Sequence, residues 1–359
     1  MRLTLMPALL NPEGSPLTLI LGRPAPLIIA EISANHNQSL ERALALVEAA
    51  ARAGVDGIKL QTYTPDSMTL DMAEREFVID DPGSPWHGAS LYQLYQEGQT
   101  PWEWHEPLFR KARELGLLAL STPFDAAAVD FLETLDPPAY KIASFEIVDI
   151  PLIQKAAATG KPLIISTGMA TLAEIDEAVQ AAREAGCQEL YLLKCTSSYP
   201  SPASTTNLLT IPHMAGAFGC PVGLSDHTLG IGVAIAAVAL GAAIIEKHLT
   251  LAREDGGIDA SFSLEPEEMR RLVEEARRAR ESLGAVHYGP TPAETGSRKL
   301  RRSLYVVEPL AAGETLTIDN VKAIRPGLGL SPKYQPAVLG RRVKRNVPKG
   351  TPLTWDLLV

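Results

Sequence analysis

Eight short apolar segments recur along the first two-thirds of the chain, and their spacing constrains the fold more than any other feature. They span residues 27–30, 55–60, 117–120, 139–143, 163–165, 190–193, 222–224 and 242–245. Runs of this length are typical of strands that are buried on both faces, as in a parallel sheet. In a parallel barrel every strand ends at the same mouth, so we expect the residues that follow these segments to converge on one cavity.

Segments with helical periodicity separate the apolar runs. Residues 40–53 repeat apolar side chains at the spacing of an amphipathic helix, and Thr171 with Glu174 forms the pattern of a capping box. Strand and helix patterns alternate eight times over roughly 250 residues, which predicts an α/β protein with a (β/α)8 TIM barrel. A doubly wound open sheet is the alternative, but the sequence lacks the Gly-rich dinucleotide loop of such folds.

The N-terminal residues and one long insertion fall outside this alternation. Residues 1–24 contain four prolines and are expected to form a hairpin that closes the bottom of the barrel. The barrel domain itself is expected to span residues 25–284. Residues 63–100 form a polar, aromatic-rich insertion after the second segment, and loops of that length in a compact domain usually have a function.

The chain beyond the barrel has a different composition. Residues 285–298 are rich in proline and glycine, which is typical of a linker. Residues 299–359 carry short β-like runs at 303–307 and 316–318, separated by turn residues. This pattern predicts a second, compact and mostly β domain.

Composition limits the classes of partner. The formal net charge of −9 argues against a nucleic-acid partner. Three cysteines are too few for a disulfide framework, and their odd number fits a reducing cytoplasm. No apolar run reaches the ~20 residues of a membrane helix, and the first ten residues lack the features of a secretory signal. We therefore expect a cytoplasmic protein that acts on small molecules.

Two lysines on predicted barrel strands suggest an anion site. A buried lysine, such as Lys59 or Lys141 would be, must find an anion or lose its charge, unless it extends to the rim. The hydroxyls of Thr122, Ser144 and Ser166 are expected nearby, and their convergence favours a phosphate or carboxylate site. Lysines in a barrel also fit a Schiff-base aldolase, which needs one lysine that is neutral and desolvated.

Two histidines follow neighbouring segments of the predicted barrel. A histidine by itself is more often a hydrogen-bonded core or rim residue. His227 and His248 together suit a divalent transition metal, with water and substrate in the open positions. Asp226 is placed to orient the first imidazole.

Glu31 opens the first loop of the predicted mouth. A carboxylate there suits a general acid or base, or a group that binds sugar hydroxyls. An ion pair with Lys59 on the next strand is an alternative and is compatible with those roles. Arg325 lies in a turn of the C-terminal domain, and its neighbours in the sequence give it no sign of function.

These residues stand in motifs that resemble the sialic-acid synthase family, in the same order along the chain. The motifs are AEISANHN at 30–37, IKLQT at 58–62, STPF at 121–124, YKIAS at 140–144, STGM at 166–169, GLSDHT at 223–228 and EKH at 246–248. The C-terminal residues resemble the family's antifreeze-like SAF domain, of β-clip fold, with IRPG at 324–327. Details at residues 32–38, 100–105 and 143–147 favour the pseudaminic acid branch, whereas Lys194 departs from the histidine often seen at its position.

The resemblance implies a transferase that condenses phosphoenolpyruvate with the open-chain aldehyde of an acetamido sugar and releases phosphate by C–O cleavage. In the favoured branch the sugar is 2,4-diacetamido-2,4,6-trideoxy-altrose and the product is a nonulosonic acid. N-acetylneuraminate and legionaminic acid synthases are alternatives with the same chemistry. A Schiff-base aldolase and a non-catalytic protein that binds ice or glycan are alternatives of other classes.

The resemblance also implies roles for individual residues. Phosphoenolpyruvate is expected at Lys59, Thr122, Lys141, Ser144, Ser166 and Ser225, and the sugar at Gln61, Glu146, Asp259 and Arg325. Mn²⁺, Mg²⁺ or Co²⁺ is expected at His227 and His248, which are the expected catalytic residues together with Glu31 as acid or base. Because the family forms a domain-swapped homodimer, Arg325 is expected to reach the barrel of a partner subunit.

Overall fold

The computed structural model describes residues 25–359, which divide into two compact units between Gly284 and Ala285. The hairpin expected for residues 1–24 lies outside this described range. Within residues 25–359, no helix combines the length and the apolar character needed to cross a membrane. The three cysteines are buried and form no disulfide.

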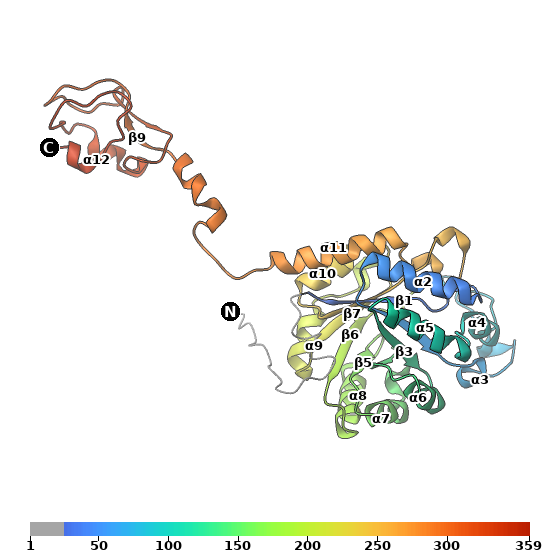
Figure 1. Cartoon of the computed structure of the whole chain (residues 1–359). Helices are drawn as coiled ribbons and strands as arrows, with labels where there is room; N and C mark the ends of the chain where they lie inside the picture. The colour runs from blue at the N-terminus through green and yellow to red at the C-terminus, as the bar shows by residue number, and fades with distance from the viewer. Residues whose placement is uncertain (1–24) are drawn as a thin grey trace. The chain divides into compact units, whose positions relative to one another are not determined.

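The first unit is a closed ring of eight parallel strands, which confirms the TIM barrel (Figure 1). The strands are β1 (Leu27–Glu31), β2 (Gly57–Thr62), β3 (Leu118–Pro123), β4 (Tyr140–Ile142), β5 (Leu163–Ser166), β6 (Leu190–Cys195), β7 (Val222–Asp226) and β8 (Ile244–His248). The ring closes where β1 pairs with β8, from Leu27 opposite Ile244 to Glu31 opposite His248. Each apolar segment of the sequence therefore supplies one strand.

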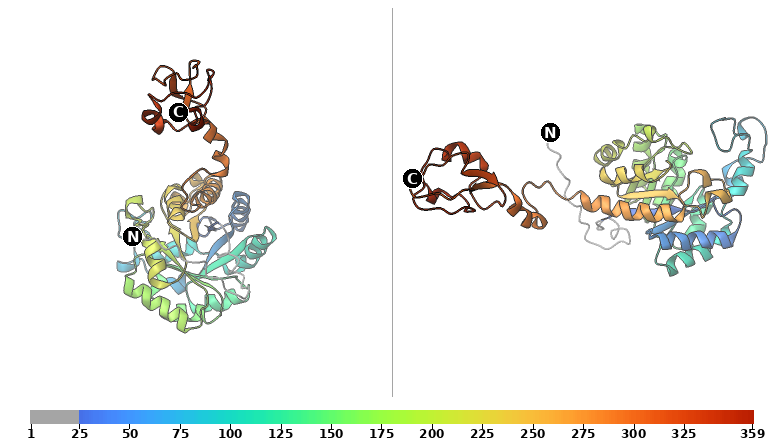
Figure 2. Two further views of the ribbon diagram at one scale, coloured as in Figure 1. Left: turned by 90° about the vertical axis from the view of Figure 1, so that its left-hand side faces the viewer. Right: turned by 90° about the horizontal axis from the view of Figure 1, so that it is seen from above.

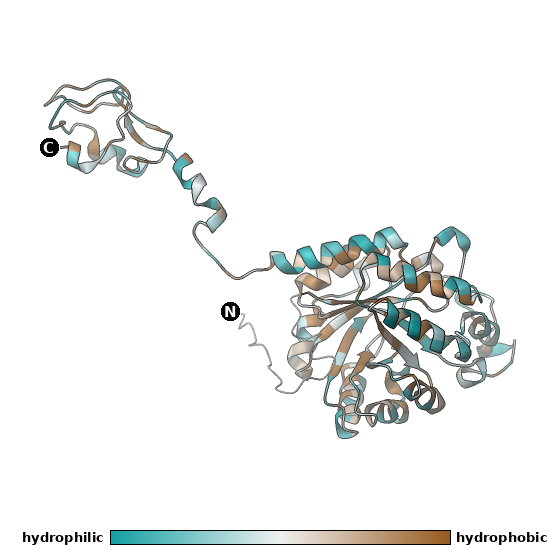
Figure 3. Cartoon of the chain, viewed as in Figure 1, coloured by the Kyte–Doolittle hydropathy of each residue, from teal (hydrophilic) through white to brown (hydrophobic). Residues whose placement is uncertain are grey.

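Helices follow the strands and cover the outside of the ring (Figure 2). They are α2 (Leu40–Ala53), α5 (Trp102–Glu114), α6 (Ala126–Glu133), α7 (Ile150–Ala157), α8 (Leu172–Glu184), α9 (Thr210–Phe218), α10 (Gly232–Ala239) and α11 (Pro266–Ser282). The expected capping box opens α8, where the Thr171 and Glu174 side chains each accept a hydrogen bond from the other residue's backbone N–H. Figure 3 shows hydrophilic residues on the outer faces of helices such as α2, α5 and α11, whereas α10 carries no polar side chain.

Side chains along each strand point alternately toward the helices and into the ring. Ile28 and Ala30 join the large core beneath the helices, whereas Leu27 and Ile29 join a smaller cluster inside the barrel. The buried members of that interior cluster are Leu27, Ile29, Leu120, Ala139, Ile164, Tyr191, Leu193 and Ile244. It fills the N-terminal part of the barrel, so the next inward positions, at the strand ends, are left to polar residues.

The insertion after β2 contains three short helical segments, α3 (Pro65–Met68), the 3-10 helix η1 (Arg75–Phe77) and α4 (Leu91–Gly98). Val78 and Ser90 form an isolated antiparallel bridge, which closes the loop between them. The side-chain amide of Gln38, in the β1–α2 loop, donates to the carbonyl oxygens of Glu97 at 2.7 Å and Gln99 at 3.0 Å. The insertion is therefore attached to the first loop of the barrel mouth.

The second unit has an apolar core of its own. Strand β9 (Ser303–Val306) pairs antiparallel with β10 (Val321–Ile324), and α12 (Gln335–Val338) is its short helix. The core comprises Leu304, Val306, Leu310, Leu316, Val321, Val338, Val343, Val347, Leu353, Leu357 and Leu358. The expected β run at 303–307 is present, but the one at 316–318 is not a strand. Leu316 is buried in the core, and its backbone N–H donates to the carbonyl of Arg341 instead of a strand.

Short 3-10 helices complete both units. In the barrel they are η2 (Glu146–Val148), η3 (Ala203–Thr205), η4 (Arg253–Asp255) and η5 (Ala260–Phe262). In the second unit they are η6 (Pro292–Glu294), η7 (Gly296–Leu300), η8 (Pro332–Tyr334) and η9 (Trp355–Leu357). Of the 3-10 helices in the barrel, η2 follows β4, η3 follows β6, and η4 and η5 follow β8. All four therefore lie in loops at the C-terminal ends of strands.

Candidate active site

The inward positions at the C-terminal ends of the strands carry most of the expected site residues. The alternation set by the interior cluster places on the inner face Glu31, Lys59, Gln61, Thr122, Lys141, Ser166, Cys195, Ser225, Glu246 and His248. Ser144, Glu146, His227 and Asp259 follow strands β4, β7 and β8 in loops at the same mouth. Arg325 is the exception, because it lies in an exposed turn after β10 of the second unit.

Four buried charged residues form one cluster in this mouth. Lys59 Nζ is in short contact with Glu31 Oε2 and lies 3.7 Å from Glu246 Oε1. Lys141 Nζ lies 3.8 Å from the same oxygen of Glu246. Two lysines and two glutamates balance in charge, which allows each of the four to be no more than 4% exposed. The ion pair considered for Glu31 from the sequence is therefore part of a larger network.

The two lysines are compensated to different degrees. Burial opposes the charge of Lys59, but the attraction of Glu246 and Glu31 outweighs burial and raises the pKa of Lys59. Burial lowers the pKa of Lys141, since Glu246 offsets it only in part. Burial also opposes the charge of Glu246, yet Lys141 and Lys59 hold its pKa below the ordinary value. An anion beside Lys141 would meet a cation that the protein itself compensates poorly.

Hydroxyl groups lie at neighbouring strand ends of the same mouth. Lys59 Nζ donates to Thr122 Oγ1 at 3.2 Å, and Ser225 Oγ donates to Glu246 Oε1 at 3.3 Å. Ser166 Oγ is buried without a hydrogen-bond partner among the described residues. Ammonium and hydroxyl donors in one buried place suit a phosphate or a carboxylate.

Gly168, in the β5–α8 turn, lets the backbone approach two further hydroxyls. Ser144 Oγ and Ser197 Oγ are 2.8 Å apart. A Cβ atom at Gly168 would lie 2.5 Å from Ser144 Cβ and 2.7 Å from Ser197 Oγ, and the residue has a φ of +43°. Only glycine meets both conditions, so the turn is built to bring main chain and serines together.

His227 and His248 stand side by side, with ring centroids 5.4 Å apart. His227 Nδ1 lies 3.1 Å from the carbonyl oxygen of Thr196. Because a carbonyl can only accept, Nδ1 carries a proton, which leaves Nε2 as the ring nitrogen for a metal ion. His248 Nδ1 lies 3.3 Å from Asp259 Oδ2, which is close enough for an ion pair but outside hydrogen-bond geometry. The Thr196 carbonyl thus orients the His227 ring, as the partners of metal-binding histidines do, whereas Asp259 lies beside His248 without a hydrogen bond to it.

The orienting role expected of Asp226 belongs to the Thr196 carbonyl instead. Asp226 points outward, where its Oδ2 lies 2.8 Å from the buried Lys247 Nζ. Within residues 25–359, no group of three or more His, Cys, Asp or Glu side chains is arranged to hold a metal ion. The His227–His248 pair fits an ion whose other coordination positions are taken by water and substrate.

The residues expected to contact a sugar lie around these groups. Gln61 is half-buried on β2 and opposite Thr122 in the strand register. Burial raises the pKa of Glu146 to about 7, and its Oε2 has no hydrogen-bond partner among the described residues. Asp259 is buried beside His248. A carboxyl that titrates near neutral pH suits proton transfer.

Sequence reasoning assigned no role to three residues of the mouth. Glu246 has the same strand parity as Ile244 and His248, so the alternation along β8 could have identified it. Cys195 shares the inward parity of Leu193, and its Sγ lies 3.9 Å from His227 Nδ1. Burial opposes ionisation of this thiol, but His227 outweighs it and lowers the pKa of Cys195 to about 7. The third, Ser197, lies beyond β6, where no periodicity marks it.

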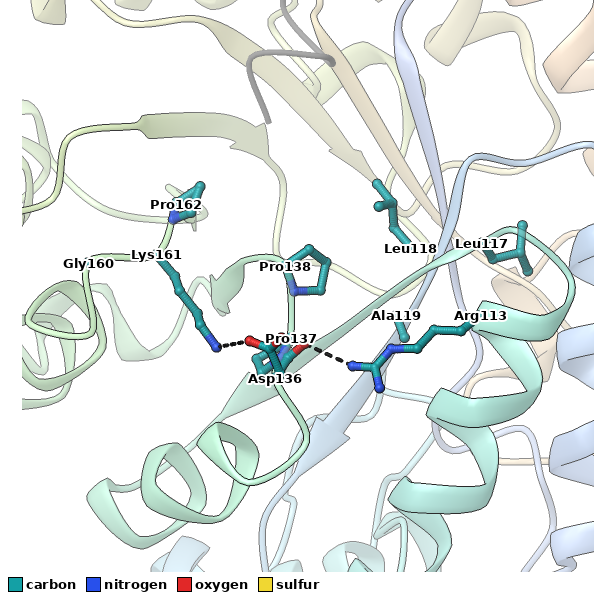
Figure 4. Close-up of a pocket in the computed structure, with 10 residues that line it drawn as sticks. All are labelled: Arg113, Leu117, Leu118, Ala119, Asp136, Pro137, Pro138, Gly160, Lys161 and Pro162. Atoms are coloured by element: carbon teal, nitrogen blue, oxygen red, sulfur yellow. Dashed lines mark hydrogen bonds and ion pairs between the residues drawn. The ribbon is translucent and has the colours of Figure 1, made fainter. Parts of the chain in front are cut away.

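A pocket of about 430 Å³ lies at the other end of the barrel (Figure 4). Its lining residues precede or begin β3, β4 and β5, and include Leu118, Pro138 and Pro162. Its charged groups are already paired, since Lys161 Nζ lies 2.8 Å from Asp136 Oδ1. The N-terminal face of a TIM barrel serves stability, so this pocket is not the candidate site.

Comparisons with known proteins agree with both units. A family model described as the NeuB family matches residues 46–288, and a SAF domain model matches residues 301–359. The chain is 43% identical to the pseudaminic acid synthase of Helicobacter pylori, over 92% of this chain and 97% of that protein. It is 36% identical to the N,N'-diacetyllegionaminic acid synthase of Legionella pneumophila, over 97% and 96%. The solved N-acetylneuraminic acid synthetase of Leptospira borgpetersenii is similar with a TM-score of 0.68 and 32% identity, over 76% of this chain and 90% of that chain.

Proposed function

The chain belongs to the NeuB family, and on that premise we propose that it makes pseudaminic acid from phosphoenolpyruvate and 2,4-diacetamido-2,4,6-trideoxy-altrose. The observation that carries this proposal is the juxtaposition, at one barrel mouth, of two buried lysines with converging hydroxyls and two neighbouring imidazoles. The likeness to pseudaminic acid synthases supports the choice of sugar. The protein is then a transferase.

The proposed reaction balances with one water molecule. The C3 carbon of phosphoenolpyruvate forms a C–C bond to the aldehyde carbon of the open-chain sugar, and the aldehyde oxygen takes up a proton. Water adds to C2 of the former phosphoenolpyruvate and loses a proton. The hydroxyl at C2 then loses its proton to the departing phosphate as the bond between C2 and the bridging oxygen breaks, so that inorganic phosphate leaves and a 2-keto acid remains.

We propose that the lysines and hydroxyls bind phosphoenolpyruvate. Lys59, Lys141 and Thr122 would bind one of its anionic groups, and the serines of β4 to β7 the other. Those serines are Ser144, Ser166 and Ser225, to which the geometry adds Ser197. The incoming anion would compensate Lys141, which Glu246 compensates only in part.

His227 and His248 would hold a divalent ion such as Mn²⁺, Mg²⁺ or Co²⁺. When bound, such an ion supplies Lewis acidity that polarises the sugar aldehyde. The two imidazoles suit this role because the Thr196 carbonyl fixes the tautomer of His227 and Asp259 lies beside His248.

Two carboxyl groups would manage protons. Glu31 accepts a hydrogen bond from the backbone N–H of Ser33 at 2.7 Å and pairs with Lys59, so it is held in one position in the mouth. Glu146, whose pKa burial raises to about 7, exists in both protonation states at neutral pH. We assign Glu31 as the catalytic acid or base and Glu146, with Gln61 and Asp259, to the sugar and the attacking water.

Steady-state kinetics with three sugars tests the proposed function. Phosphate release from phosphoenolpyruvate is measured with the diacetamido-trideoxy-altrose, its legionaminic acid counterpart and N-acetylmannosamine. We expect the highest kcat/KM for the first sugar, loss of turnover with EDTA and recovery with Mn²⁺. A clear preference for another sugar would contradict the substrate assignment.

The same assay separates a Schiff-base aldolase from the proposed synthase. The pKa of Lys141 is lowered by burial, which is the property such an enzyme needs. Borohydride treatment during turnover would then attach substrate to the protein covalently. We expect no such adduct, together with one phosphate released for each sugar consumed.

A further inference from the structure

The insertion after β2 brings Trp86 to strand ends that are not neighbours of β2. The indole Nε1 donates to the carbonyl oxygen of Ile258, after β8, at 3.0 Å. The indole also packs on Tyr199, after β6, with ring centroids 5.7 Å apart. In the ring order, β2 lies between β1 and β3, and β6 is on the opposite side. The insertion therefore extends across the barrel mouth or along its rim to contact the loops of its far side.

Hydrogen bonds within the loop hold Trp86 in place. The Ile79 N–H donates to the Ala89 carbonyl at 3.0 Å, and the Gly88 N–H donates to the Ile79 carbonyl at 2.8 Å. The Trp86 N–H donates to Ser84 Oγ at 3.1 Å. A compact loop with its ends paired and its tip bonded to another loop presents a defined surface.

Trp86 belongs to a chain of aromatic rings that leads to the two histidines. The Tyr199 ring lies 4.5 Å from the His227 ring and 5.3 Å from the Phe262 ring. The Phe262 ring lies 5.1 Å from that of His248. Trp86 is thus separated by one ring from His227 and by two rings from His248, the imidazoles at which the sugar aldehyde is proposed to react.

The surface that the indole presents to this part of the mouth is apolar. Its single N–H is already used by the Ile258 carbonyl, and the ring has no acceptor. A methyl group packs well against such a surface, whereas a hydroxyl placed there loses its hydrogen bonds to water.

We infer that Trp86 is a specificity-determining residue, which selects acetamido sugars with a C6 methyl group over sugars with a C6 hydroxyl. This inference rests on the proposed function and assigns a role to the insertion. The selection is carried by contact with the sugar, so it acts on the sugar KM and leaves the affinity for phosphoenolpyruvate unchanged.

The test compares kcat/KM for the diacetamido-trideoxy-altrose with kcat/KM for N-acetylmannosamine in wild type, Trp86→Ala and His87→Ala. His87 is exposed in the same loop and is the matched control. We expect Trp86→Ala to lower the ratio of the two values about 10-fold, through a higher KM for the trideoxy sugar. The KM for phosphoenolpyruvate should change less than twofold, and His87→Ala should match wild type.

Wild-type turnover decides the proposed function, and the ratio in Trp86→Ala decides the inference. A wild type that prefers the trideoxy sugar, with an unchanged ratio in Trp86→Ala, would overturn the inference and leave the function intact. If Trp86→Ala does not fold, Trp86→Phe keeps an aromatic ring at the site. The test is then the change in tryptophan fluorescence when the sugar binds. With Mn²⁺ and inorganic phosphate in place of phosphoenolpyruvate, the sugar should change the tryptophan emission of wild type and not of Trp86→Phe. Equal changes in both proteins would overturn the inference.

Discussion

At the scale of single residues, Glu246 compensates two buried cations of the mouth, because one of its oxygens faces both Lys59 and Lys141. The substitution Glu246→Gln keeps the shape and removes the charge. Breaking a buried ion pair on one side costs about 3 kcal/mol of stability, since it leaves a buried cation uncompensated. We therefore expect a lower Tm for Glu246→Gln than for wild type, and a larger rise in Tm on adding phosphoenolpyruvate, whose charge replaces the lost carboxylate.

The control for this substitution is Glu48→Gln, which removes the carboxylate partner of Lys111 on the surface. Exposed pairs contribute little, so its Tm should stay close to that of wild type. Equal effects of phosphoenolpyruvate on the Tm of Glu246→Gln and of wild type would show that the anion does not bind beside Glu246.

Glu146 gives the protein a pH dependence with a definite sign. Burial raises its pKa from the ordinary 4.5 to about 7 in the folded protein, so the folded state binds more protons than the unfolded state between these values. Its contribution to stability is present below pH 4.5 and is lost as the pH rises to 7. The substitution Glu146→Gln removes this pH-dependent loss of stability, because the amide does not titrate. The stability of Glu146→Gln relative to wild type should therefore increase by up to about 3 kcal/mol from pH 4.5 to pH 8.

Chemical unfolding of both proteins at several pH values, without metal or substrate, measures this difference. Glu177→Gln, at an exposed position of α8, is the control for the loss of a surface carboxylate. A difference between Glu146→Gln and wild type that does not vary with pH would contradict the assigned environment of Glu146.

At the scale of elements, the strands and their order were predictable. A strand whose two faces are both buried appears in the sequence as a continuous apolar run. Lys59 and Lys141 were predictable as candidate site residues because they interrupt such runs, and Ser166 because it follows one; all three face inward. Glu246 was given no role because its pairing with Lys59 and Lys141 appears only in the folded barrel. Trp86 was missed as a mouth residue because its partners at Ile258 and Tyr199 are far away in the sequence.

The β5–α8 turn carries a prediction at this scale. Gly168→Ala would place a methyl group 2.5 Å from Ser144 Cβ, in a backbone conformation with a φ of +43°. We expect the turn to move away from Ser144 and Ser197, so that the KM for phosphoenolpyruvate rises about 10-fold, equivalent to a loss of about 1.4 kcal/mol in binding. The variant should also lose roughly 1–2 kcal/mol of stability from backbone strain.

Gly219→Ala is the matched control, because its φ is +62° and a Cβ there meets no atom within 4 Å. It should lose stability from backbone strain alone and keep the KM of wild type. If both variants kept that KM, the turn would have no part in binding phosphoenolpyruvate.

At the scale of the whole molecule, the second unit carries Arg325 in an exposed turn after β10. We propose a homodimer in which Arg325 reaches the barrel mouth of the partner subunit and contacts an acetamido group. Arg325→Ala should then raise the sugar KM about 10-fold while the KM for phosphoenolpyruvate stays the same. Arg342→Ala, at another exposed position of the second unit, should have no effect. A monomeric mass in sedimentation, or an unchanged sugar KM, would contradict the proposal.

The mouth divides into an anion site on β2 to β7 and a pair of imidazoles on β7 and β8. This arrangement predicts which bond of phosphoenolpyruvate is cleaved. If the anion site holds phosphoenolpyruvate while water adds at C2, the bridging oxygen leaves with phosphorus. Turnover of phosphoenolpyruvate labelled with ¹⁸O at the bridging position, in the presence of the diacetamido-trideoxy-altrose and Mn²⁺, tests this directly by mass spectrometry. We expect the label in inorganic phosphate and none in the nonulosonic acid; label retained in the organic product would contradict the account.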